Sequence, residues 1–164
     1  MQYTLKKSLG QHFLNDAQVC LNIKAVLQAQ SIAQMVEVGP GGGALTQHIH
    51  DLPTESFKAI ELDREKIAFL LKEFPYLKGK LIEADFLAAG IPFDNEFVVV
   101  GNFPYNISTQ IVFKVLEWRE QVPMMVNMWC TQISLNMCIR KTNKCFCRVY
   151  GVIRGSTFSC TKRC

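Results

Sequence analysis

Residues 97–108 read Phe97-Val98-Val99-Val100-Gly101-Asn102-Phe103-Pro104-Tyr105-Asn106-Ile107-Ser108. The run up to Gly101 is continuously apolar and rich in β-branched residues, which predicts a strand buried on both faces. Asn102 therefore falls at the carboxyl end of that strand, where ligands bind in open parallel α/β sheets. Pro104 fixes its own φ and favours extended backbone at Phe103, so the carbonyl groups of this turn can accept hydrogen bonds from a ligand.

The side chains that follow this strand suit a planar ligand with an amino group. Asn102 offers an amide oxygen as acceptor, and Tyr105 offers a flat face on which an aromatic base can stack. A turn that only closes a strand does not require the order Asn, aromatic, Pro, Tyr. Ser108 is expected to be the N-cap of the next helix. The motif therefore predicts a site for an exocyclic amine on an aromatic ring.

The sequence Asn-Phe-Pro-Tyr-Asn-Ile-Ser resembles the catalytic motif of the ribosomal RNA adenine dimethyltransferases, and residues 1–123 as a whole are similar to that family. The family transfers two methyl groups from S-adenosylmethionine to the N6 amino group of an adenine. The resemblance implies a Rossmann-like class I methyltransferase fold, with ribosomal RNA of the small subunit, in a pre-ribosomal particle, as the partner. It assigns the catalytic role to Asn102, Phe103, Pro104 and Tyr105, and it also places Asn102 near the methionine portion of the cofactor.

A glycine-rich turn follows the first predicted strand, Met35–Val38, and reads Gly39-Pro40-Gly41-Gly42-Gly43-Ala44-Leu45-Thr46. Glycines let the backbone approach a ligand closely, so Gly39 and Gly41 are candidate cofactor contacts. The spacing also satisfies the dinucleotide-binding pattern, because an acid lies about twenty residues further on. Glu37, two positions before the first glycine, resembles the methyltransferase version of the motif. A dinucleotide-dependent oxidoreductase remains the alternative from another enzyme class.

Acids end the next two predicted strands. The strand over residues 57–63 brings Glu61 to the ligand-binding edge, where a carboxylate can accept from both hydroxyls of a ribose. Asp63 is expected to cap the following helix. The strand over residues 80–86 ends at Asp85 and Phe86, to which the resemblance assigns the amino group and the ring of the cofactor adenine. Capping of its own loop is the alternative role for Asp85.

The amino-terminal segment Lys6–Asp16 resembles an arm that closes over the cofactor in this family. The resemblance assigns that role to His12 and Leu14, and His12 stands where the family usually has Asn. Helical spacing of apolar residues predicts scaffold helices over residues 15–30, 63–74 and 108–118, the second ended by Pro75. Residues 124–129 predict a fifth strand. The fold is thus expected to be a doubly wound α/β sheet, truncated after four to five strands.

The chain has 164 residues, enough for one domain, and its composition changes sharply near residue 124. Residues 1–123 hold 11 basic and 14 acidic residues, giving 11 − 14 = −3, whereas residues 124–164 hold 7 basic residues and no acid, giving +7. Six of the seven cysteines lie in the second part. We interpret residues 1–129 as a partial S-adenosylmethionine-binding domain and residues 130–164 as an atypical Cys-rich basic tail, out of frame or disordered.

No Cys-x2-Cys pair is present, so we expect no metal site. No apolar run has the length of a membrane span, which predicts a cytoplasmic protein with no membrane partner.

Since the family's RNA-contacting domain has no counterpart in these residues, we expect little turnover on ribosomal RNA by this chain alone. Erythromycin-resistance methyltransferases, which act on large-subunit RNA, and a mitochondrial transcription-factor relative, which would use the fold only for binding, share these motifs and remain alternatives.

Overall fold

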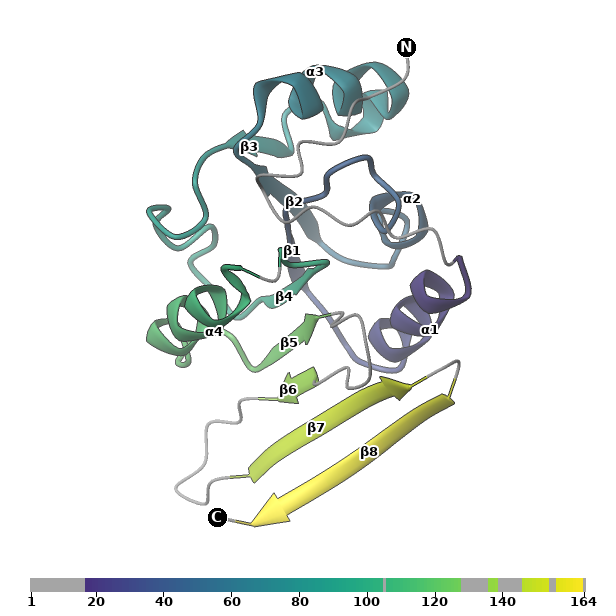
Figure 1. The fold of residues 1–164 in the computed structure, drawn as a ribbon, viewed down its shortest axis with the longest axis vertical. Coiled ribbons are helices and arrows are strands. Elements are labelled where there is room, and N and C mark those ends of the chain that lie inside the picture. The colour runs from purple at the N-terminus through teal and green to yellow at the C-terminus, as the bar shows by residue number, and fades with distance from the viewer. Residues whose placement is uncertain (1–16, 105, 128–135, 139–145, 154–155, 164) are drawn as a thin grey trace.

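The computed structural model describes residues 17–104, 106–127, 136–138, 146–153 and 156–163. They form a five-stranded parallel sheet with helices on both faces and a three-stranded antiparallel sheet (Figure 1). The parallel strands are β1 (Gln34–Val38), β2 (Ser56–Glu61), β3 (Leu81–Glu83), β4 (Val98–Gly101) and β5 (Met124–Asn127). The helices are α1 (Ala17–Gln28), α2 (Thr46–Ile49), α3 (Arg64–Glu73), the 3-10 turn η2 (Pro75–Leu77) and α4 (Ser108–Glu117). The predicted α/β class with a parallel sheet of five strands is confirmed.

The strand order is β3-β2-β1-β4-β5, so the chain winds outward from β1 in both directions. All four pairings are parallel, and Val38 of β1 lies in register with both Ile60 of β2 and Gly101 of β4. The carboxyl ends of these strands therefore form one edge. The reversal of strand order falls between β1 and β4, which is where doubly wound sheets bind their ligands.

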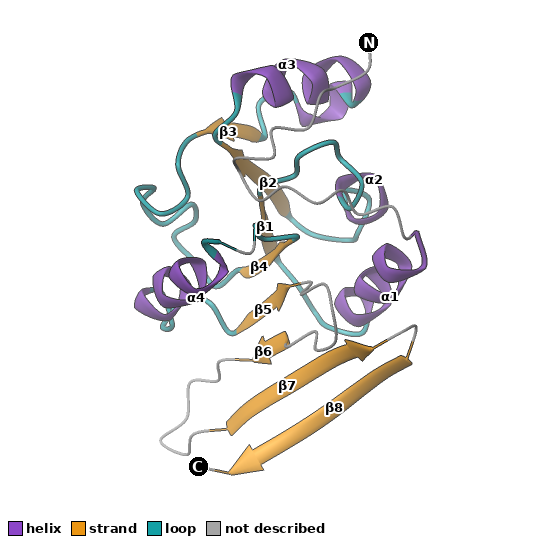
Figure 2. Cartoon of the chain, in the orientation of Figure 1, coloured by secondary structure: helices purple, strands orange, loops and turns teal. Residues whose placement is uncertain are grey.

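Successive residues of a strand point to opposite faces of the sheet, and their side chains pack into two separate hydrophobic cores, one on each face. Figure 2 shows α1 and α2 on one side of the sheet and α4 on the other. Met35 and Val100 belong to the core under α1, α2 and α3, whereas Val36 and Val99 belong to the core under α4. Both faces of β1 and β4 are therefore buried, and for β4 the continuous apolar run predicted this.

Several local expectations needed adjustment. The strand expected over residues 80–86 is shorter, because β3 ends at Glu83 and leaves Asp85 and Phe86 in the loop beyond it. The expected first helix ends at Gln28 rather than near residue 30, and β2 ends at Glu61 rather than at Asp63. The apolar spacing that predicted the helix over residues 63–74 includes Leu71 as well as Leu70, but Leu71 is 39% exposed and Leu70 is the position that faces the core. The prediction that Asp63 caps α3 is confirmed, since its carboxylate accepts from the backbone N–H of Glu65 at 3.0 Å.

The antiparallel sheet consists of β6 (Asn136–Cys138), β7 (Phe146–Ile153) and β8 (Ser156–Arg163). β6 lies beside β5, and β7 and β8 pair over their whole length (Figure 1). These strands were not anticipated for a tail expected to be out of frame or disordered. Residues 146–153 are nevertheless rich in aromatic and β-branched types, which favour strands without requiring a helical or alternating pattern. The domain boundary at residue 129 stays a prediction.

Within the described part of the chain, no helix combines the length and the apolar character needed to cross a bilayer.

Candidate functional site

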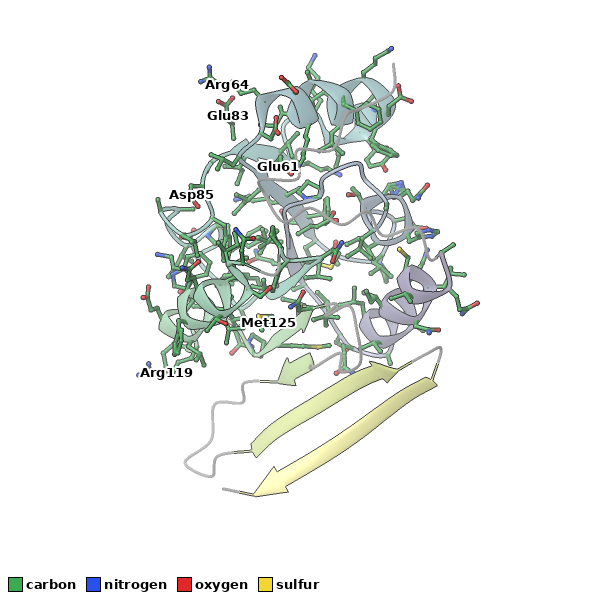
Figure 3. The ribbon with its side chains drawn as sticks, viewed as in Figure 1. Glu61, Arg64, Glu83, Asp85, Arg119 and Met125 are labelled. Carbon is green, nitrogen blue, oxygen red and sulfur yellow. The ribbon has the colours of Figure 1, made fainter. Side chains whose placement is uncertain are left out.

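The candidate site lies along the carboxyl edge of the parallel sheet, where four loops leave β1, β2, β3 and β4. Glu61 is the last residue of β2, and Asp85 lies two residues beyond the end of the neighbouring strand β3; Figure 3 labels both. The glycine-rich turn follows β1, and Asn102 follows β4. Strand register thus brings the predicted polar residues to one edge although they are spread over about sixty residues of sequence.

Three glycines of the turn after β1 adopt left-handed backbone, with φ of 66° at Gly39, 59° at Gly41 and 79° at Gly43. Among the described residues, a methyl group added at Gly39 would meet no atom within 4 Å, and one at Gly41 would meet only the Gly39 carbonyl oxygen at 3.8 Å. A methyl group at Gly43 would instead overlap the ring of Phe74. The first two glycines therefore leave open space above the backbone, and the third lets the turn pack against the C-terminal end of α3.

Glu61 is held by backbone donors from two loops. Its Oε1 accepts from the N–H groups of Leu62 and Asp63, both at 3.0 Å, and its Oε2 accepts from the Gly41 N–H at 3.1 Å. The Lys66 ammonium lies 3.9 Å from Oε2, and Glu61 is only 6% exposed. The carboxylate is therefore tied to the glycine turn and oriented before any ligand arrives.

Glu37 is a second buried acid on the adjacent strand, with 1% exposure. Burial raises the pKa of its carboxyl to about 8; the hydrogen bond from Thr46 opposes this rise, and the negative charge of Glu61 adds to it. Thr46 Oγ1 donates to Glu37 Oε2 at 2.7 Å. At neutral pH this carboxyl is thus mainly protonated, and it holds the first turn of α2 rather than offering a charge to a ligand.

The loop after β4 folds back over its own strand. Phe103 is 2% exposed, and its ring lies so close to Gly101 that any side chain there would overlap the ring and the Val38 carbonyl oxygen. The Phe103 N–H donates to Asn127 Oδ1 at 3.2 Å. Asn102, between these two anchored residues, is only partly buried.

The Pro104 carbonyl is already committed to the start of α4. It accepts from Ser108 Oγ at 2.8 Å and from the Ile107 N–H at 3.1 Å, which uses both of its lone pairs. The prediction that Ser108 is the N-cap of α4 is wrong, because Ile107 occupies that position and the Ser108 hydroxyl bonds backward to Pro104. The Phe103 carbonyl is the other acceptor that this turn can offer to a ligand amine.

Asp85 and Phe86 follow β3 in different environments. Asp85 is exposed, and its Oδ1 accepts from the Leu87 N–H at 2.9 Å, so it does cap its own loop with one carboxylate oxygen. The ring of Phe86 is buried edge-on against Trp118, with 5.3 Å between ring centroids. Their contact with a cofactor adenine stays a prediction.

His12, Leu14 and Tyr105 lie outside the described residues. Among the residues that are described, no group of three or more His, Cys, Asp or Glu side chains could hold a metal ion.

Two residues of the site were missed by sequence reasoning. Asn127 anchors the loop after β4, and Lys66 is a mostly buried cation beside Glu61. Asn127 has a signal in retrospect, because a polar residue ends an otherwise apolar strand next to the Asn102 strand. Lys66 has none, since a lysine on an amphipathic helix is ordinarily solvated.

Comparison with known proteins connects this geometry to one family. The model of the family described as ribosomal RNA adenine dimethylase matches residues 2–149, so the match passes residue 129. A ribosomal RNA small subunit methyltransferase A from Cytophaga hutchinsonii is 42% identical over 144 residues, which are 86% of this chain and 56% of that protein. The same-named protein from Flavobacterium johnsoniae is 39% identical over 151 residues, 90% of this chain and 56% of its own length. The chain thus spans about half the length of the curated relatives it matches.

Among solved structures, the 23S rRNA methyltransferase ErmE is similar with a TM-score of 0.62 and 26% identity, over 71% of this chain and 47% of that one. A dimethyladenosine transferase from Plasmodium falciparum is similar in fold, with a TM-score of 0.56 and 24% identity over 71% of this chain and 42% of its own.

Proposed function

The chain belongs to the ribosomal RNA adenine dimethylase family, and on that premise we propose that it is the cofactor-binding and catalytic part of an enzyme that methylates the N6 amino group of adenines in small-subunit ribosomal RNA. The observation that carries the proposal is the pairing of two loops at one sheet edge. Val38 and Gly101 are in register, so the glycine-rich turn and the Asn102 motif start side by side. A cofactor on the first loop would therefore lie next to a target amine on the second.

S-adenosylmethionine fits the groups that surround the glycine turn. The open space above Gly39 and Gly41 admits a ligand close to the backbone, and the oriented carboxylate of Glu61 suits a ribose diol. We propose that Asp85 and Phe86 complete the adenine end, that His12 and Leu14 cover the cofactor, and that Asn102 lies at its methionine end. When bound, S-adenosylmethionine supplies the methyl group.

The residues after β4 would act on the target amine by accepting its hydrogen bonds. The lone pair of an adenine amino nitrogen is delocalised into the ring, which makes the nitrogen a poor nucleophile. Hydrogen bonds from its two N–H groups to the Asn102 side-chain oxygen and to the Phe103 carbonyl favour a tetrahedral nitrogen with a localised lone pair. The Pro104 carbonyl is excluded from this role by its two existing donors.

No strong general base is needed in this scheme, because the methylated nitrogen would carry a positive charge and could release its proton to water after the methyl group has arrived. Positioning then supplies most of the rate enhancement. Tyr105 is proposed to stack on the target base, which must be taken from an unpaired RNA loop or turned out of a helix.

Specific observations support two alternatives to this function. The similarity to ErmE favours large-subunit RNA as the substrate, although the more similar relatives carry the small-subunit name. The glycine spacing alone also suits a dinucleotide-dependent oxidoreductase. A cytoplasmic location and a pre-ribosomal particle as partner are part of the proposal for the whole protein.

Calorimetric titration of the purified chain with S-adenosylmethionine and with NAD separates the enzyme classes. We expect binding of S-adenosylmethionine and no measurable binding of NAD. Binding of NAD alone would overturn the methyltransferase proposal and support the oxidoreductase.

The catalytic assignment needs a separate experiment in a chain extended to the length of the relatives. Asn102→Ala should lower single-turnover methyl transfer far more than it weakens cofactor binding, because its hydrogen bond strengthens as the amine becomes tetrahedral. Parallel assays with small-subunit and large-subunit RNA identify the substrate. Equal losses of cofactor affinity and methyl transfer would remove Asn102 from the chemical step.

A further inference from the structure

The side chain of Asn127 connects the end of β5 to the Asn102 motif. Asn127 is the last residue of β5, lies in register with Gly101 and is 5% exposed. Its Oδ1 accepts the Phe103 N–H at 3.2 Å. A side chain of one strand thus bonds to the backbone of the loop that leaves the neighbouring strand.

The hydrogen bond from the Phe103 N–H to Asn127 fixes the peptide plane between Asn102 and Phe103. The peptide group between Asn102 and Phe103 is planar, so an acceptor that captures the Phe103 N–H also sets the direction of the Asn102 carbonyl. It limits the rotation of the Asn102 backbone and hence the direction in which the Asn102 side chain leaves it. The buried Phe103 ring restrains the following residue, but a ring in a core does not by itself define the orientation of the preceding peptide.

Two other features of the loop act at different places. The Pro104 carbonyl is held by Ser108 and Ile107, which lie beyond the proline and restrain the start of α4. On the strand side, Gly101 has no side chain that could hold the loop, and the Val38 carbonyl and the Phe103 ring occupy the space that a side chain would need. Without Asn127 the Phe103 N–H would lose a partner in a buried setting, at a cost that favours rearrangement of the turn.

We propose that Asn127 is a positioning residue of the methyl-transfer site, acting through the Phe103 N–H to hold the Asn102 amide in the direction required by the target amine. The inference rests on the proposed function, because it gives the orientation of Asn102 its purpose. Asn127 itself touches neither the substrate nor the cofactor in this assignment.

Two substitutions of similar shape isolate the acceptor oxygen. Asn127→Asp keeps an oxygen where Oδ1 lies, whereas Asn127→Leu fills the same space without an acceptor. Val126→Ala, one residue earlier in β5, is the control for a general loss of strand stability, since Val126 is fully buried in the core under α1. The measurements on the intact 164-residue chain are amide hydrogen exchange, the NMR signals of the Asn102 side-chain amide, and the melting temperature.

In Asn127→Leu we expect the Phe103 amide to exchange roughly tenfold faster relative to the β4 amides, the factor that corresponds to one lost hydrogen bond. The Asn102 side-chain signals should move as well. Asn127→Asp should keep the protection of the Phe103 amide and the Asn102 signals, while Val126→Ala should speed exchange throughout β4 and β5 without a selective effect at Phe103.

Unchanged Phe103 protection in Asn127→Leu, or unmoved Asn102 signals, would overturn the positioning role. So would a uniform change of all β4 amides like that of Val126→Ala. Titration of the unsubstituted chain with S-adenosylmethionine is run alongside. A failure to bind cofactor would count against the proposed function, whereas the exchange and NMR results report on Asn127 in either case.

Discussion

The loops that follow β1 and β4 start opposite each other at the same sheet edge but are fixed by different means. The loop after β1 uses left-handed glycines, and its Gly41 N–H is bound to the Glu61 carboxylate of the neighbouring strand. The loop after β4 uses a proline, a buried aromatic ring and an acceptor from Asn127. One loop is shaped by the absence of side chains and the other by their presence.

This difference corresponds to what each loop presents. Bare glycine backbone leaves room for a ligand to lie against the chain, as the open space above Gly39 and Gly41 indicates. The loop after β4 instead presents one partly exposed side chain, Asn102, on a backbone held on both sides of it. The first arrangement suits binding of a large cofactor, and the second suits precise placement of a reacting group.

The largest loss of stability is expected at a glycine whose Cα is in contact with other atoms, rather than at one that faces open space. Gly101→Ala would place a methyl group 2.5 Å from the Val38 carbonyl oxygen and 2.6 Å from the Phe103 ring, so strand and loop must both shift. We expect a loss of about 3 kcal/mol in the free energy of unfolding, measured by urea denaturation. The methyl group of Gly39→Ala would meet no atom of the described residues, so this variant should cost only about 1–2 kcal/mol through its left-handed backbone. An equal loss in both variants would contradict the distinction between a packed and an open glycine.

The role of Glu61 in the first loop predicts the next effect. Glu61→Ala should weaken S-adenosylmethionine binding by about 1–3 kcal/mol, because it removes charge-assisted hydrogen bonds to the ribose and frees the Gly41 N–H. Calorimetric titration measures the change. Glu83→Ala is the matched control, since this acid ends the adjacent strand but is half exposed and pairs with the surface residue Arg64 at 2.5 Å. Unchanged affinity in a folded Glu61→Ala variant would remove Glu61 from the cofactor site.

The contrast between Glu37 and Glu61 predicts a pH dependence of stability. Burial raises the pKa of Glu37 from 4.5 to about 8, so between these values the folded state keeps a proton that the unfolded state releases. The free energy of unfolding should therefore fall as pH rises through this window, by up to about 1.4 kcal/mol per pH unit from this group. Glu37→Gln, which keeps an acceptor for Thr46 but cannot ionise, should lose this slope. Urea unfolding at several pH values within the window tests it, and identical slopes in the two proteins would show that Glu37 is ionised in both states.

Much of this architecture was predictable because its signals are local. A continuous apolar run identified β4, and the core strand before the glycines identified β1. Polar residues at or just beyond the ends of β2, β3 and β4 located the site edge. Glycine spacing predicted the turn after β1. What the sequence did not reveal depends on contacts between distant segments. Asn127 and Phe103 are 24 residues apart, and their hydrogen bond exists only because β4 and β5 are neighbours. Lys66 is only five residues from Glu61, and its burial depends instead on how α3 packs against β2.

Ser108 shows the same limit within a single turn. Serine is a common N-cap residue at the start of an apolar helix. Here, however, the Ser108 hydroxyl donates backward to the Pro104 carbonyl, which the turn at the proline brings within reach. Side-chain preference alone could not distinguish the two partners, because each satisfies the hydroxyl.

Removing the hydrogen bond from Ser108 to the Pro104 carbonyl should have the smallest effect on stability. It tests what holds the loop after β4 on the carboxyl side of Pro104. Ser108→Ala should lower the free energy of unfolding by about 1 kcal/mol, the usual contribution of one hydrogen bond, because the Ile107 N–H still donates to the Pro104 carbonyl. Thr109→Ala, at an exposed position of the same helical turn, is the control and should cost less than half as much. Since the freed lone pair makes the Pro104 carbonyl available again, Ser108→Ala should leave cofactor affinity unchanged while altering the selectivity of the site for the target amine. A loss several times larger than that of one hydrogen bond would mean that Ser108 organises the whole start of α4, and the loop after β4 would then depend on its helix as much as on Asn127.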